Sequence, residues 1–108
     1  MKLITAIVQD EDVNRLLDSL VEAGYRATKV ASTGGFLRSG NSTVIIGVED
    51  HLVDDVIRII DRNCHTRVEV VNPLARMGPG EFYMPEPVEV QVGGAIIFVQ
   101  NVEQYLRL

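Results

Sequence analysis

The apolar positions of this chain change their spacing several times, and two segments repeat them at the period of a helix. In both segments the apolar residues recur at intervals of three and four, which gives each segment one apolar face. Acidic residues precede each repeat, where the helix dipole favours them, and Gly24 follows the first as a stop signal. The pattern predicts two amphipathic helices, with apolar positions Val13, Leu16, Leu17, Leu20 and Val21 in the first and Val53, Val56, Ile57 and Ile60 in the second.

Runs rich in Val, Ile and Thr lie around the helices and end at Gly, Asn, Asp or Pro, as β-strands commonly do. They cover residues 2–9, 25–32, 42–48 and 67–71. The order is therefore strand, helix, strand, turn, strand, helix, strand, which is the ferredoxin-like βαββαβ arrangement of the α+β class. We expect a four-stranded antiparallel sheet with both helices on one face.

The last third of the chain begins with a long stretch, residues 72–87, that contains all four prolines. A loop of this length inside a compact domain is usually functional or mobile. Two further strand-like runs follow, residues 88–92 and 95–100, separated by Gly93 and Gly94. They predict extra C-terminal strands, either as a hairpin with a two-residue turn or as one extended segment interrupted by a bulge.

The predicted strands are apolar on both faces. Ile4, Ala6 and Val8 point to one side of the first strand, and Leu3 and Ile7 point to the other. Two helices cover only one face of a sheet, and a soluble monomer rarely exposes an apolar surface of that size. We expect a homo-oligomer whose sheets pack together; the alternative is that the C-terminal strands and the long loop fold back over the second face.

Length and charge restrict the remaining possibilities. With 108 residues the chain has the size of a single domain, residues 1–108. The apolar run before Asp10 is too short for a signal peptide or a membrane span, and a single cysteine, Cys64, fits a reducing compartment, so we expect a cytoplasmic protein without membrane association. The formal net charge of -5 argues against a nucleic-acid polymer as the partner.

One segment departs from this acidic character, because residues 26–43, RATKVASTGGFLRSGNST, contain no acidic residue. Its glycines, Gly35 among them, allow a run of backbone N–H groups to form an anion-binding nest. Phe36 and Leu37 form an apolar pair that a simple turn does not need and that suits the flat face of a nucleobase. The alternative is that Phe36 packs against a neighbouring subunit and the basic side chains are merely solvated.

No pattern of catalytic or metal-ligating residues emerges. Cys64 and His65 are adjacent, and the other histidine, His51, lies too far along the chain to complete a recognisable metal-ligand spacing. Asp54, Asp55 and Asp61 fall on the solvent side of the second helix. We expect neither an enzyme nor a metal or cofactor site.

Several stretches resemble the PII-like cyclic di-AMP receptor proteins, over nearly the whole chain. They are MKLITAIVQDED, YRATKVASTGGFLRSGNST, the MG of the long loop and PVEVQVGGAIIFVQNVE. The resemblance implies a homotrimer of ferredoxin-like subunits that binds cyclic di-AMP in each cleft between neighbours. It also implies a short T-loop at about residues 33–42 and a long B-loop at about residues 72–87.

The resemblance implies a ligand site as well. The matching positions are Arg26, Thr28, Phe36, Leu37, Asn41, Gly47 and Phe98. Gly35 joins them because its backbone can approach an anion closely. In this reading Phe36 and Leu37 pack on an adenine, and Phe98 arrives from the C-terminal strand of the same or the adjacent subunit. The chain departs from the family pattern at Gly24, where relatives often carry a polar residue, and at Arg107, where a Gln is expected.

The function that follows is a non-enzymatic signalling protein. Cyclic di-AMP would bind at the subunit interfaces, order the loops and so change a surface that an unidentified downstream protein reads. Two alternatives remain: a PII-type nitrogen regulator that binds ATP or ADP, which would need a longer T-loop and a more basic B-loop, and a ligand-free structural or metal-tolerance trimer.

Overall fold

A computed structural model describes residues 1–31, 37, 40–71 and 87–108 of the chain. Its elements are β1 (Lys2–Gln9), α1 (Asp10–Glu22), β2 (Ala27–Ala31), β3 (Asn41–Val48), a short 3-10 turn η1 (Asp50–Leu52), α2 (Val53–Cys64), β4 (Arg67–Val71), β5 (Val88–Val92) and β6 (Ala95–Asn101). Both predicted helices are confirmed.

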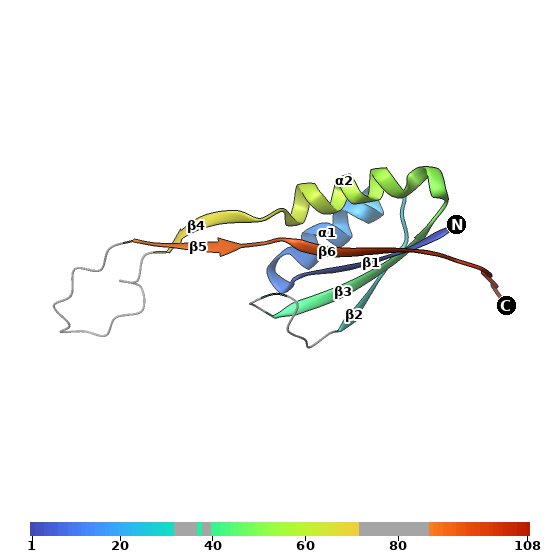
Figure 1. Cartoon of the computed structure of the whole chain (residues 1–108), viewed down its shortest axis with the longest axis horizontal. Coiled ribbons are helices and arrows are strands. Elements are labelled where there is room, and N and C mark those ends of the chain that lie inside the picture. Colours follow the sequence, from blue (N-terminus) through green and yellow to red (C-terminus); the bar gives the residue numbers. More distant parts are fainter. Residues whose placement is uncertain (32–36, 38–39, 72–86) are drawn as a thin grey trace.

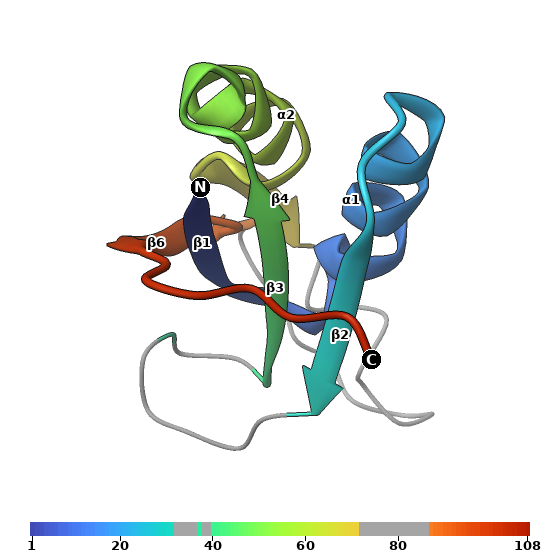
Figure 2. The ribbon, with the colours of Figure 1, turned by 90° about the vertical axis from the view of Figure 1, so that its right-hand side faces the viewer.

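The main sheet has four strands in the order β2-β3-β1-β6, and each neighbouring pair is antiparallel. Figure 2 shows α1 and α2 side by side on the same face of this sheet. The predicted α+β class and the ferredoxin-like, PII-like arrangement are therefore confirmed in outline. We call the face opposite the helices the open face.

The sequence assigned the wrong segment to the fourth strand. We expected residues 67–71 beside β1, but β6 takes that place, with seven Cα partners from Lys2↔Asn101 to Val8↔Ala95. The central strand β1 is apolar on both faces, so its neighbour must also be apolar on both, and β6 provides this with Ile96, Ile97 and Phe98 in succession. The β4 strand places Arg67 and Glu69 on one of its faces and cannot do the same.

The strand β4 instead pairs with β5 in a separate two-stranded sheet, which we call the ribbon. Figure 1 shows the ribbon extending beyond the end of the main sheet, with β5 running on into β6 along nearly the same line. The prediction of a hairpin between residues 88–92 and 95–100 is therefore wrong, and the alternative of one interrupted extended segment is correct. Gly93 and Gly94 make the interruption with φ of +80° and +99°, a region that side chains other than glycine disfavour.

The core lies between the helices and the main sheet. Fully buried side chains from alternate positions of β1 and β3 meet the apolar stripes of both helices, and they include Ile4, Val8, Val44, Leu16, Leu20, Val56 and Ile60. On the open face burial is less complete, and Phe98 of β6 is 47% exposed. The apolar second face predicted from the sequence is therefore only partly covered by the described parts of a single chain.

Among the described residues, neither helix has the length and apolar character needed to span a membrane.

Candidate functional site

The open face brings together residues that are far apart in the sequence. Sheet register places Thr28 opposite Ile45, Ile45 opposite Thr5, and Thr5 opposite Phe98, so these four form one row across all four strands. Residues in one cross-strand row point to the same face. Because the neighbouring row contains Ile4 and Ile46 of the core, Thr28 and Phe98 must face away from the helices. Two of the predicted site residues thus share the open face.

A hollow of about 280 Å³ lies at one end of this face, and we call it the tail hollow. Three predicted site residues line it, namely Arg26, Thr28 and Gly47. A Cβ at Gly47 would meet Met1 Cε at 3.5 Å, which is an ordinary contact. The fold of the chain would therefore accept a side chain at this position, and the glycine contributes open space beside the basic residue.

Arg26 is an exposed cation at the tail hollow. Within the described ranges it makes no ion pair, whereas Arg15 and Arg67 are both paired with acids. An unpaired guanidinium beside an apolar hollow offers a planar fork of N–H donors to a phosphate or to the edge of a base. The chemistry of the tail hollow therefore suits an anionic ligand that also has a flat apolar part.

The tail hollow has further walls that the sequence did not identify. Leu3 and Ile45 form part of its floor, and Val102 and Tyr105 enter from the C-terminal tail. The tail is held at this end of the sheet because the Val102 N–H donates to the carbonyl of Met1 at 3.1 Å. Figure 2 shows the tail crossing in front of β3 and β2. Tyr105 is 64% exposed, so an aromatic ring stands beside Arg26. A seven-residue tail has too few positions for periodicity to reveal this placement.

The remaining described site residues lie at the other end of the sheet. Leu37 lines a second hollow of about 290 Å³, the ribbon hollow, together with Gln9 at the end of β1 and Gly93 at the foot of the ribbon. Asn41 is buried and is the Cα partner of Gln9. Gly47 lies six residues further along β3 than Asn41, a distance of about 20 Å along a strand. Within one chain, the residues that line the tail hollow and those near the ribbon hollow therefore lie at opposite ends of the sheet.

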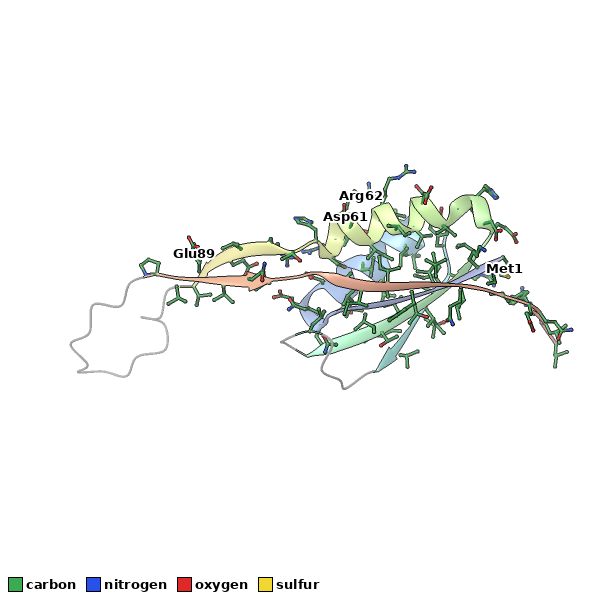
Figure 3. The ribbon with its side chains drawn as sticks, viewed as in Figure 1. Met1, Asp61, Arg62 and Glu89 are labelled. Carbon is green, nitrogen blue, oxygen red and sulfur yellow. The ribbon has the colours of Figure 1, made fainter. Side chains whose placement is uncertain are left out.

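Figure 3 shows the same separation along the molecule. Met1, a wall of the tail hollow, lies at one end, and Glu89 lies on the ribbon at the other. Asp61 and Arg62 point away from the sheet on the outer side of α2, as we expected for Asp61. Gly35 and Phe36 lie outside the described residues, as do most of the predicted T-loop and residues 72–86 of the predicted B-loop.

The cysteine of this chain does not present a reactive thiol. Cys64 is fully buried, and burial, aided by the charge of Asp12, raises the pKa of its thiol to about 12, so it stays protonated at neutral pH. In the parts of the chain that the structure describes, no three His, Cys, Asp or Glu side chains are placed to share a metal ion. What the geometry does offer is a binding surface.

Comparisons with known proteins agree with this picture. The chain is 44% identical to a functionally unknown protein from Pediococcus pentosaceus ATCC 25745, whose crystal structure superposes with a TM-score of 0.81 over 99% of this chain and 96% of that one. It is 37% identical over 79 residues to the nitrogen fixation nifHD region GlnB-like protein 1 of Methanothermococcus thermolithotrophicus, covering 61% of this chain and 75% of the relative. Residues 1–108 match the family described as cyclic-di-AMP receptor, and the chain therefore belongs to the cyclic-di-AMP receptor family.

Proposed function

We propose that this protein is a non-enzymatic sensor that binds cyclic di-AMP where copies of the chain meet and relays its presence to a protein partner. The observation that carries this proposal is the tail hollow, where the unpaired guanidinium of Arg26 stands beside Thr28 and the open space of Gly47. Family membership supplies the identity of the ligand. The hollow supplies what a purine phosphate needs: a cation, a hydroxyl and an apolar surface.

The distribution of site residues favours a site shared between chains. Arg26 and Gly47 lie at one end of the open face, and Leu37 and Asn41 lie at the other. Packing open faces against one another would cover the apolar surface and would bring opposite ends from different chains together. A homotrimer satisfies both requirements with three equivalent sites. Light scattering at low micromolar concentration tests this assembly, and a monomeric mass would contradict it.

The roles of individual residues follow from their chemistry. Arg26 and Thr28 donate to phosphate or to a base edge, and Gly47 lets the ligand approach the strand. Phe98 offers an exposed aromatic ring in the middle of the open face. Leu37, with Phe36 and Gly35 from the T-loop, would contact an adenine and its phosphate, and Asn41 would orient them.

Signalling would follow from loop ordering. A ligand shifts a loop population only by binding one conformation more tightly than another. The T-loop, at about residues 33–42, carries Leu37 and Asn41 of the proposed site, and the B-loop, at about residues 72–87, joins the two strands of the ribbon. Ordering either loop on the ligand would create a surface for the downstream protein.

A thermal-shift panel with cyclic di-AMP, cyclic di-GMP, ATP and AMP tests the function. Preferential binding to the folded state raises the melting temperature, so we expect a clear rise with cyclic di-AMP and smaller or no rises with the others. A comparable rise with ATP would favour a PII-type regulator instead. No rise with any nucleotide would favour a structural or metal-tolerance trimer. Phe36→Ala should weaken the response to cyclic di-AMP while leaving the oligomer mass unchanged.

A further inference from the structure

The ribbon has little support of its own. Val68, Val70 and Val88 are each more than half exposed, and the β4–β5 pair forms no ladder with the main sheet. An isolated two-stranded hairpin is only marginally stable in water. The direction in which the ribbon leaves the body must therefore depend on contacts at its foot, where β4 begins and β5 ends (Figure 1).

One arginine dominates that foot. Arg67 is the first residue of β4, and its Nη2 lies 2.8 Å from Asp12 Oδ1 while its Nη1 lies 3.4 Å from Asp12 Oδ2. The Asp12 side chain is 1% exposed, in the first turn of α1, and that of Arg67 is 25% exposed. The hydrogen bond to Asp12 raises the pKa of Arg67. A two-pronged bond to a buried carboxylate fixes the orientation of the arginine as well as its position.

Asp12 is also held by a second arginine, Arg15. Arg15 Nη2 lies 3.1 Å from Asp12 Oδ1 and donates to the carbonyl of Asn63 at 2.7 Å. Arg15 therefore ties α1 to the end of α2, whereas Arg67 ties the same carboxylate to the ribbon. This division lets the two connections be broken separately.

Gly93, the residue that follows β5, leaves room for Arg67. A Cβ at Gly93 would come within 2.6 Å of Arg67 Nη1 and 2.5 Å of the His65 carbonyl, so only glycine leaves room for the pair. The Gly93 N–H donates to Gln9 Oε1 at 2.6 Å. Gln9 and Gly93 also line the ribbon hollow together with Leu37. The placement of Arg67 on Asp12 thus sets one wall of the hollow that contains a proposed ligand residue.

We propose that Asp12 and Arg67 are positioning residues: the ion pair of Arg67 with the buried Asp12 fixes the ribbon against the body and thereby shapes the ribbon hollow at Leu37. Ligand affinity then depends on a pair that does not line either hollow. The part of this inference that concerns the ligand rests on the proposed function, and the part that concerns the ribbon does not.

The test compares Arg67→Gln with Arg15→Gln. Both remove one of the two arginines that hold Asp12, but only Arg67 belongs to the ribbon. In Arg67→Gln we expect amide hydrogens of residues 67–71 and 88–92 to exchange faster in the free protein, and the dissociation constant for cyclic di-AMP to rise roughly tenfold. In Arg15→Gln we expect wild-type exchange in these strands and a dissociation constant within about twofold of wild type, whatever its melting temperature.

Equal effects of the two substitutions on exchange and affinity would overturn the proposal, because the pair would then be merely structural. A looser ribbon with unchanged affinity would overturn its ligand part. If Arg67→Gln does not fold, Arg67→Lys replaces it; Lys keeps the charge but loses the fork, and wild-type values in both measurements would contradict the proposal. If the wild-type protein binds no cyclic di-AMP, the proposed function fails, while exchange in the free protein still decides whether Arg67 holds the ribbon.

Discussion

Asp12 and Arg26 lie near opposite ends of the central strand β1, and their charges are compensated in different ways. Where β1 ends, the carboxylate of Asp12 is buried and is held by Arg15 and Arg67. Where β1 begins, Arg26 stands exposed at the tail hollow, without an ion pair among the described residues. A buried charge must be compensated by the protein itself, whereas an exposed cation is free to meet a charge from outside. The comparison agrees with a structural role for Asp12 and with the proposed ligand-binding role for Arg26.

The largest effect is expected from removing the carboxylate of Asp12. Asp12→Ala leaves the guanidinium groups of Arg15 and Arg67 without their shared carboxylate, so the free energy of unfolding should fall by about 3 kcal/mol. Urea denaturation measures this change. Asp18→Ala is the matched control, since Asp18 is an exposed acid on the same helix, and it should lower stability by no more than about 0.5 kcal/mol. Equal losses from both substitutions would show that the buried pair has no special role.

The next largest effect is expected from removing the side chain of Arg26. Arg26→Ala should weaken cyclic di-AMP binding by about 2 kcal/mol, roughly thirtyfold in dissociation constant, because a charge-assisted contact is lost. Since Arg26 makes no ion pair within the described ranges, the melting temperature without ligand should hardly change. Calorimetry gives the affinity. Lys29→Ala is the control, because it removes a nearby cation from β2 at a position that pairs with Val44, a core residue, and not with the open face. A similar loss in both variants would indicate general electrostatic attraction.

A smaller effect is expected from Gly47→Ala, which tests whether the ligand occupies the tail hollow beside β3. Gly47→Ala adds a Cβ in ordinary contact with Met1, so the free energy of unfolding should change by less than about 1 kcal/mol. The added methyl group occupies space proposed for the ligand, so affinity should fall by about 1 kcal/mol. Paired thermal and calorimetric titrations separate the two quantities. An unchanged affinity for cyclic di-AMP would mean that the ligand does not approach β3 at Gly47.

The smallest expected effect is the low reactivity of Cys64 in the folded protein. Because burial raises the pKa of Cys64 to about 12, the reactive thiolate is scarce at pH 8 in the folded protein. The thiol should therefore resist alkylation by iodoacetamide until denaturant exposes it, as mass spectrometry can follow. Rapid labelling of the native protein would mean that the junction of α2 with the ribbon opens readily.

The helices were predictable because their apolar residues report burial directly through a 3.6-residue period. The competition between β4 and β6 for a place beside β1 was not, because it depends on which strand suits a neighbour that is apolar on both faces. Local patterns mark both segments as strands and do not state their partners. The Gly93–Gly94 pair likewise suits a hairpin turn and an interrupted strand equally well.

The candidate site shows the same limit. Thr28, Gly47 and Phe98 were named from a resemblance, and the register then places them through alternation along strands. Tyr105 was missed because its place depends on where the tail turns after β6. Asp12 and Arg67 were missed because 55 residues separate them, and a first-turn acid normally indicates only a helix start.

The glycine pair between β5 and β6 determines which side chains face which side in the two sheets. The chain enters the main sheet directly from the ribbon, and just two residues separate the last rung of one ladder from the first rung of the other, Val92 from Ala95. Side chains alternate between faces with a period of two. Deleting one glycine would therefore require either the ribbon to turn over or β6 to shift by one residue, so that Phe98 takes the inward-facing position of Ile97 opposite Ala6. Two residues without side chains thus decide which residues of β6 face the core and which face outward.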